Sequence, residues 1–237
     1  AGWLIAQAGV SLPPAPVRAR RSPSCAGPDK RASCAPPRKE TLMKKKKGLA
    51  APYAQLTKDA RFEGTWRVDQ RGNVLFPHRD EEGLCGYEVK NRGYTSFASQ
   101  GIKTLWRSRG FDTDDRLVIA ESAIDALSYH QLHGVGSARY ASIGGAPSPY
   151  AVEQLLHSVR RMPRDARVVL AVDHDSGGDK LAARLKPVIH AQGREVHRHS
   201  PATVGRDWNA VLQRRERAYI AQLTAPRRRG LDVGIER

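Results

Sequence analysis

The sequence predicts an α/β protein in which a parallel sheet with helices on both faces is preceded by a small antiparallel β domain. The first observation is that residues 115–213 alternate between short apolar runs and stretches with apolar residues at helical spacing. The second is a group of short alternating segments over residues 62–107. Alternation of strand and helix is typical of a parallel sheet, because the connecting helices cover both of its faces.

Two segments outside these regions are strongly basic. Residues 1–50 hold +9 of the formal net charge of +16, and residues 214–237 are predicted to form a basic helix and tail. The segment 1–51 is rich in Pro and Arg and poor in large apolar residues, so burial cannot offset the entropy of ordering it, and we expect it to be disordered. A positive surface attracts polyanions, which makes nucleic acid the expected partner class; a solvated basic tail is the alternative.

Residues 62–107 are predicted to form a small antiparallel sheet. Two segments, 73–77 and 84–89, flank residues 80–83, whose composition is typical of a turn between strands. Such a sheet would carry several basic side chains that could face a nucleic-acid backbone, although basic residues on a hairpin are more often plain solvated surface. They are Arg79, Lys90 and Arg92.

Four strands and four helices are predicted in residues 115–213. The apolar run 167–172 is the clearest buried strand, because it is apolar without interruption after its first residue. The other predicted strands are 116–120, 139–143 and 195–199, and the predicted helices pass through 123–132, 152–159, 181–188 and 208–212.

Three acidic residues directly follow predicted strands. Glu121 follows the first strand, and Asp173 and Asp175 follow the third. Ligands of such sheets bind at the carboxyl ends of the strands, where the strand order reverses, so we expect these three side chains to share one rim. They would repel one another without a cation, and Mg²⁺ prefers such oxygen ligands. The alternative is that each acid caps the following helix, as Asp175 could for a helix entered at Gly178.

Other residues near this rim fit an anionic ligand. Gly144 and Gly145 end the second strand and would let backbone amides approach a phosphate, although a tight turn alone also explains them. Lys180 could contact phosphate, but a solvated helix position is the more common case.

Two further acids extend the predicted metal site. Asp125 lies four residues after Glu121, on the same face of the first helix, where it could contact metal-bound water or act on the helix dipole. Asp207 and Asn209 form an acid-amide pair that could hold a second metal ion.

The cysteines and the apolar runs exclude other classes. Cys25, Cys34 and Cys85 form no Cys-x-x-Cys pair, so we expect no disulfide framework, no zinc site and a reducing, cytoplasmic location. The longest apolar runs fall far short of the roughly 20 residues that a bilayer requires, so no membrane partner is expected.

Three segments together resemble a known family. Residues 117–127, 142–145 and 172–178 resemble the successive signatures of the Toprim domain, the catalytic module of bacterial primases, type IA and type II topoisomerases and overcoming-lysogenization-type nucleases. The resemblance implies that Glu121 is the acid-base glutamate, that Asp173 and Asp175 are the metal-binding pair, and that Asp125 is the acid that often follows the glutamate in primases.

The segment 205–209 is similar to a later Gly-Lys-Asp segment of primases, in which Asp207 would hold further metal. This chain has Asn209 where an acid is usual, which leaves a complete second metal site open. Residues 62–107 resemble the small domain that precedes Toprim in bacterial primases, and still more a short uncharacterised domain of plasmid-borne Toprim proteins.

The resemblance implies a protein that acts on nucleic acid. The expected activity is that of a primase-like nucleotidyl transferase of a plasmid or other mobile element, dependent on Mg²⁺ with Mn²⁺ as the alternative ion. Its ligands would be DNA, single-stranded by expectation, and nucleotides. The alternatives are a Mg²⁺-dependent Toprim nuclease and a catalytically idle nucleic-acid-binding accessory protein.

Overall fold

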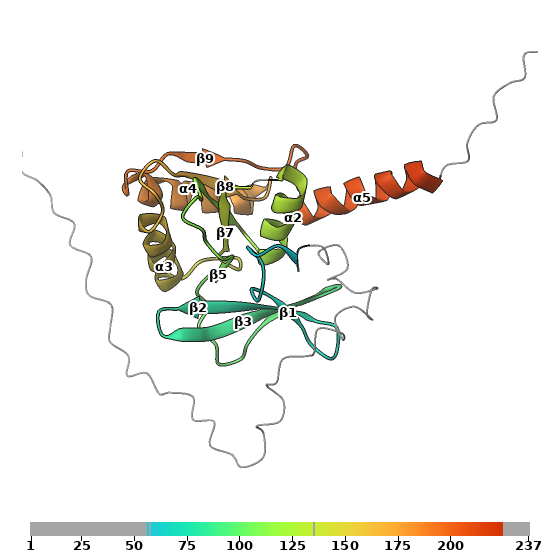
Figure 1. Ribbon diagram of the computed structural model, residues 1–237, viewed down its shortest axis with the longest axis horizontal. Helices are drawn as coiled ribbons and strands as arrows, with labels where there is room; N and C mark the ends of the chain where they lie inside the picture. The colour runs from blue at the N-terminus through green and yellow to red at the C-terminus, as the bar shows by residue number, and fades with distance from the viewer. Residues whose placement is uncertain (1–55, 57, 135, 225–237) are drawn as a thin grey trace, which may run out of the picture. The chain divides into compact units, whose positions relative to one another are not determined.

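The computed structural model describes residues 56, 58–134 and 136–224. The predicted disorder of residues 1–51 and the end of the predicted C-terminal tail lie outside the described residues. The described elements form two sheets and a set of helices (Figure 1). No helix in these ranges is both long enough and apolar enough to cross a membrane.

The first sheet is antiparallel throughout, as predicted for residues 62–107. Its strands follow one another in the order β1-β2-β3-β4, and a register shift between His78 and Arg79 interrupts the pairing of β2 with β3. Only Glu81 and Glu82 separate these two strands, so the turn is shorter than predicted. The strands are β1 (Arg67–Val68), β2 (Val74–Asp80), β3 (Gly83–Asn91) and β4 (Tyr94–Phe97).

The second sheet is largely parallel, and it confirms the predicted α/β class. Its order is β5-β7-β6-β8-β9, in which β6 pairs in parallel with both β7 and β8, and β8 pairs in parallel with β9. The edge strand β5 is antiparallel to β7, a pairing that the sequence did not predict. The strands are β5 (Trp106–Arg107), β6 (Arg116–Ala120), β7 (Ala138–Ser142), β8 (Arg167–Ala171) and β9 (Val196–Arg198).

Four helices accompany this second sheet, and three begin at capping residues. The side chains of Ser122, Ser148 and Asp175 accept hydrogen bonds from backbone amides in the first turns of α2, α3 and α4. The last helix, α5, runs without a break to Thr224, so it joins the predicted helix at 208–212 to the start of the predicted basic C-terminal helix. The helices are α2 (Ala123–His133), α3 (Pro149–Arg160), α4 (Ser176–His190) and α5 (Trp208–Thr224).

The strand β6 divides the core, because its successive side chains point to opposite faces. Leu117 and Ile119 pack in a cluster with residues of α3 and α4. Val118 packs in a second cluster with residues of α2 and with Phe76 and Trp106, which come from the antiparallel sheet and the β5 edge. One face of the parallel sheet is therefore covered partly by the antiparallel sheet. The division of the chain into domains 62–107, 115–213 and 214–237 stays a prediction.

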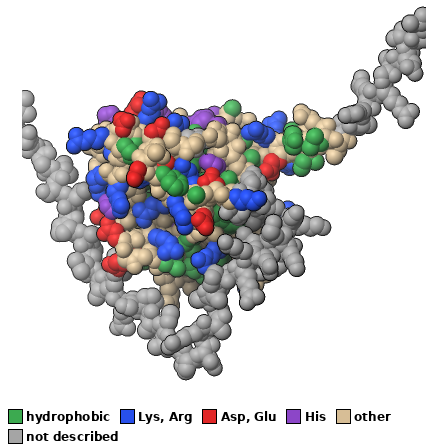
Figure 2. Space-filling model, in the orientation of Figure 1, with side chains coloured by type: hydrophobic (Ala, Val, Ile, Leu, Met, Phe, Trp, Pro, Cys, Tyr) green, Lys and Arg blue, Asp and Glu red, His purple; other side chains and the backbone are tan. Residues whose placement is uncertain are grey.

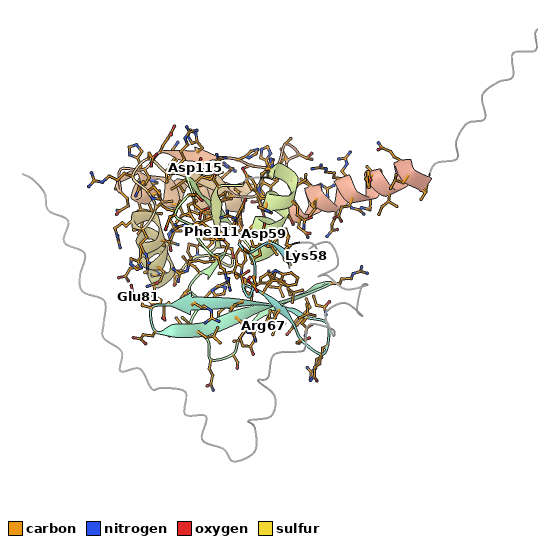
Figure 3. The ribbon with its side chains drawn as sticks, in the orientation of Figure 1. Lys58, Asp59, Arg67, Glu81, Phe111 and Asp115 are labelled. Atoms are coloured by element: carbon orange, nitrogen blue, oxygen red, sulfur yellow. The ribbon has the colours of Figure 1, made fainter. Side chains whose placement is uncertain are left out.

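A buried ionic network joins the segment before β1 to the parallel sheet. Asp114 is fully buried and lies 2.7 Å from the Arg61 guanidinium and 3.0 Å from that of Arg139 on β7. The backbone N–H of Phe111 also donates to Asp114, at 2.6 Å. Figure 3 labels Phe111 in this region, where the Arg61 guanidinium lies 4.9 Å from the centre of the Phe111 ring.

The tip of the β2–β3 hairpin contacts α3. Glu81, labelled in Figure 3, lies 3.3 Å from Nδ1 of His157, and the Tyr150 hydroxyl donates to the Asp80 carboxylate at 2.9 Å. The hairpin is therefore held at its turn by α3, in addition to the packing of Phe76 in the core.

Candidate functional site

The predicted rim is formed by the carboxyl ends of three neighbouring strands. Glu121 follows β6, Gly144 and Gly145 follow β7, and Asp173 follows β8. Because β7 and β8 lie on opposite sides of β6, the strand order reverses at this point. This is the position at which open α/β sheets bind ligands.

Asp173 and Glu121 are the central pair of this rim. The backbone N–H of Asp173 donates to Oε1 of Glu121 at 3.0 Å, and the backbone N–H of Gly145 donates to the Glu121 carbonyl at 3.1 Å. The Asp173 side chain has a buried oxygen, Oδ1, that receives no hydrogen bond from any described residue. Buried acceptors normally have a donor, so this oxygen marks a place for a ligand.

The electrostatics of the rim favour a bound cation. Burial, together with the carboxylates of Asp125, Glu121, Asp207 and Asp175, raises the pKa of Asp173 to about 8. Burial also raises the pKa of Glu121, with the charges of Asp175 and Asp207 acting in the same direction. A positive ion beside Asp173 would reverse these effects and let its carboxyl ionise at neutral pH.

Asp125 is buried between the first turns of α2 and α5. Its carboxylate accepts a hydrogen bond from the Ser122 hydroxyl at 2.5 Å and another from the backbone N–H of Asn209 at 3.2 Å. Burial raises its pKa to about 6, although these hydrogen bonds oppose the shift. Asp125 therefore joins the two helix ends behind the rim.

Asp175 and Asp207 both cap helices, as the alternative interpretation of the strand-end acids proposes. Oδ1 of Asp175 accepts from the backbone N–H of Gly178 at 2.8 Å, and Oδ1 of Asp207 accepts from that of Ala210 at 2.6 Å. Strand β8 ends at Ala171, so Asp173 and Asp175 both lie beyond its last residue.

The residues present fit a cation with few protein ligands. In the described ranges, no group of three or more His, Cys, Asp or Glu side chains is placed to hold a metal ion. Mg²⁺ is commonly held by one or two carboxylates, with water and substrate phosphates completing its coordination. The buried Oδ1 of Asp173, which accepts no hydrogen bond from the described residues, and the neighbouring Glu121 carboxylate match that ligand set. The five-acid site that the sequence predicts, with Asp125, Asp175 and Asp207 as further ligands, stays a prediction.

A cleft of about 1600 Å³ opens in front of the rim. Two of the three predicted nucleic-acid contacts, Lys90 and Arg92, lie in its wall, whereas Arg79, Asp175 and Lys180 are not among the lining residues. Lys and Arg side chains with acids between them cover much of the face shown in Figure 2. The rim lines the cleft with Glu121, Asp125, Asp173 and Asp207, the antiparallel sheet and its β3–β4 turn with Glu88, Lys90 and Arg92, the segment before β5 with Lys103, and α5 with Gln213, Arg217 and Tyr219.

The glycine turn is packed against the antiparallel sheet. Gly144 has φ +64°, and a Cβ there would lie 2.6 Å from Oε1 of Glu88 and 2.8 Å from Cε of Lys103. Glu88 is buried, and burial raises its pKa. Sequence reasoning missed both side chains, although the alternation of β3 places Glu88 on the same face as Lys90.

Arg198 is a further residue that sequence reasoning missed. From the end of β9 its guanidinium donates to the Asp173 carbonyl at 3.2 Å and lies 2.6 Å from the Asp179 carboxylate. Its charge lowers the pKa of Glu121 and so opposes the effect of burial. A strand-end arginine opposite two strand-end acids is the signal that could have indicated it.

Comparisons with known proteins agree with this geometry. Residues 118–212 match a family model described as Toprim-like. No curated protein matches the chain. Among solved structures, a chain in the complex of bacteriophage T7 lagging-strand DNA polymerase with primase domains of two gp4 subunits is 16% identical, with a TM-score of 0.42, 66% of this chain covered and 80% of that chain.

Two bacterial primases are also similar. The RNA polymerase domain of Mycobacterium tuberculosis primase DnaG is 17% identical, with a TM-score of 0.41, 73% of this chain covered and 65% of that one. The zinc-binding and RNA polymerase domains of the Aquifex aeolicus primase are 15% identical, with a TM-score of 0.42, 79% of this chain covered and 49% of that one. This chain thus spans less than two thirds of the length of both. The family model matches the segment from β6 to the first turn of α5, so residues 118–212 resemble a Toprim domain.

Proposed function

We propose that this protein is a primase-like, metal-dependent nucleotidyl transferase that acts on nucleic acid. The observation that carries the proposal is the buried, unpartnered oxygen of Asp173, which lies among carboxylates in a cleft that also contains basic side chains. Such a combination can bind a cation and a phosphate together. The carboxylates hold the cation, and the basic side chains and the cation neutralise the charge of the phosphate. Residues 62–107 support an origin in a plasmid or other mobile element through their resemblance to plasmid-borne proteins.

Asp173 and Glu121 would hold Mg²⁺ or Mn²⁺. When bound, the ion neutralises charge on the phosphate and favours ionisation of the attacking hydroxyl. Lys90, Arg92 and Lys103 would bind phosphates from the opposite wall of the cleft. Glu121 would accept the proton of the attacking hydroxyl, since its carboxylate lies beside Asp173 at the rim and lines the cleft.

The helix-capping roles of Asp175 and Asp207 favour a second candidate, a nucleic-acid-binding accessory protein without catalysis. Two of the acids that the family resemblance assigns to metal are already bonded to helix ends. A protein in which those acids only stabilised the fold would keep the basic side chains of the cleft, Lys90, Arg92 and Lys103, and could still bind nucleic acid.

One assay separates these functions. The purified chain is incubated with single-stranded DNA, labelled nucleoside triphosphates and Mg²⁺ or Mn²⁺. New labelled oligomers support the proposal, shortened DNA indicates a nuclease, and retarded but unchanged DNA indicates the accessory protein. We expect Asp173→Asn to lower synthesis by about 100-fold or more, the range of one lost site group. The exposed Asp165, in the loop before β8, provides the control Asp165→Asn, which should keep full activity.

Metal binding has a test that is independent of activity. A ligand present at 100 times its Kd stabilises the folded state by about 2.7 kcal/mol, so saturating Mg²⁺ should raise the thermal midpoint of the wild-type protein. Asp173→Asn should lose most of that rise, whereas Asp165→Asn should keep it. An equal rise in all three proteins, measured by calorimetry at pH 7.5, would place the ion elsewhere.

A further inference from the structure

The second half of α5 forms an outer wall of the cleft. Only Trp208 and Leu212 are buried in this helix, while Tyr219 and Leu223 are 62% and 68% exposed. Figure 1 shows this half of α5 leaving the other described elements, and Figure 2 shows hydrophobic side chains gathered on it.

One face of this half-helix continues the cleft away from the acids. Gln213, Glu216, Arg217 and Ile220 line the cleft, and their spacing of three and four residues places them on one face, with Tyr219 beside them. The same helix begins next to Asp207, which lines the rim end of the cleft. A ligand held at Asp173 therefore has a continuous surface along which it can extend.

The chemistry of this wall fits a single strand of nucleic acid. Such strands are bound by cations that contact phosphates and by aromatic faces on which bases stack. Arg217 supplies the cation, and its Nε donates to the Gln213 carbonyl at 3.2 Å, which holds the guanidinium along the helix. Tyr219 supplies the aromatic face, and Ile220 adds apolar surface beside it.

We propose that the α5 wall, defined as Gln213, Arg217, Tyr219 and Ile220, binds single-stranded nucleic acid that extends from the cleft. Arg217 pairs with a phosphate, and Tyr219 stacks on a base. The proposal rests on the proposed function. It adds a second contact surface to the one that Lys90 and Arg92 provide on the antiparallel sheet. Charge favours this occupant over a second copy of the chain, because residues 214–217 carry three arginines against Glu216 and would repel their own copy.

Two matched pairs of variants test the α5 wall. Arg217→Gln is compared with Arg214→Gln, and Tyr219→Ala with Leu223→Ala, because Arg214 and Leu223 are exposed on the same helix but do not line the cleft. Affinity for a labelled oligothymidylate of about 16 nucleotides, a length within single-strand site sizes, is measured by fluorescence anisotropy over a range of salt concentrations.

Tyr219→Ala should raise Kd by about 5-fold or more, since one stacked base contributes about 1–3 kcal/mol. Tyr219→Phe should restore the affinity, because it keeps the ring. Arg217→Gln should weaken binding and reduce the slope of log K against log salt by about 0.7, the value for one phosphate contact on a single strand. Both control variants should bind as the wild type does.

Three results would overturn the proposal. If the wild type binds but all four variants bind equally well, the strand does not follow α5, and the proposed function is untouched. If Tyr219→Ala and Leu223→Ala both change the sedimentation coefficient, the face is a contact between copies of the chain. If the wild type binds no oligothymidylate at any salt concentration, the proposed function falls together with the α5 wall.

Discussion

At the scale of single residues, the interior of the antiparallel sheet changes the pKa of a buried histidine. His78 on β2 is fully buried, and its ring packs edge-on against Phe97 with ring centres 5.0 Å apart. Burial, assisted by the charge of Lys103, lowers the pKa of His78 to about 4. The imidazole is therefore neutral in the folded protein at every pH at which the site is expected to work.

This shift predicts a loss of stability in acid. Between about pH 6.5 and pH 4 the unfolded chain binds a proton at His78 and the folded chain does not, so the free energy of unfolding falls as the pH falls through that window. His78→Phe should remove about 2–3 kcal/mol of this dependence. Urea unfolding at pH 7.5 and pH 4.5 measures it, with the exposed His190→Phe as the control; equal pH dependence in all three proteins would contradict the assignment.

Residue identities at the rim were predictable, because acids that follow apolar strands can be read from the sequence. Glu121 and Asp173 lie next to each other, since the backbone N–H of Asp173 donates to the Glu121 carboxylate. Glu88, Lys103 and Arg198 were not predicted, because each reaches the rim from another strand or loop through tertiary packing. Lys180 is exposed on α4 and does not line the cleft, and its contact with phosphate stays a prediction.

At the scale of elements, the turn after β7 is the place where a substitution of glycine is tolerated least. Gly144 needs both a positive φ and the space that Glu88 and Lys103 leave to it. Gly134, which ends α2 with φ +59°, needs only the positive φ, since nothing lies within 4 Å of the Cβ it would gain. Substitution of the two glycines by alanine therefore distinguishes the cost of backbone strain from the cost of steric overlap.

Gly134→Ala should cost about 1 kcal/mol of stability through backbone strain alone. Gly144→Ala should cost about 1–3 kcal/mol more, because Glu88 and Lys103 must move. Calorimetric unfolding of the two variants measures the difference. Equal losses would show that the antiparallel sheet does not press on the turn.

The strands of the parallel sheet were predictable except for the edge strand β5. The predicted strands 116–120, 139–143 and 167–172 lie within one residue of β6, β7 and β8, because buried parallel strands must be apolar. The second half of α5 falls in the segment predicted to be a basic helix and tail, but its continuity with the predicted helix at 208–212 was not predicted, because its exposed face carries no apolar periodicity. The two-residue strand β5 gives too short a pattern to detect.

At the scale of the whole molecule, the Arg61–Asp114–Arg139 network holds the segment before β1 against the parallel sheet. Asp114 and Asp115 are adjacent, but Asp114 is fully buried between two arginines whereas Asp115 forms an exposed pair with Arg116. Removal of one partner from a buried ion pair leaves a charge that nothing neutralises.

Asp114→Ala should therefore destabilise the protein by about 3–5 kcal/mol. The matched change Asp115→Ala should cost at most about 1 kcal/mol, as is usual for exposed pairs. Chemical unfolding followed by both far-ultraviolet circular dichroism and tryptophan fluorescence measures the two losses. A small loss for Asp114→Ala would show that water or a shifted side chain replaces the carboxylate.

The shared core also limits how the chain can be divided. Phe76 and Trp106 cover the face of the parallel sheet that presents Val118 and Tyr140. A shortened chain that starts at residue 115 would leave that face in contact with water, where it would favour aggregation. An unrelated module in place of the antiparallel sheet would have to cover Val118 and Tyr140 as Phe76 and Trp106 do. Changes in one sheet are therefore constrained by the packing of the other.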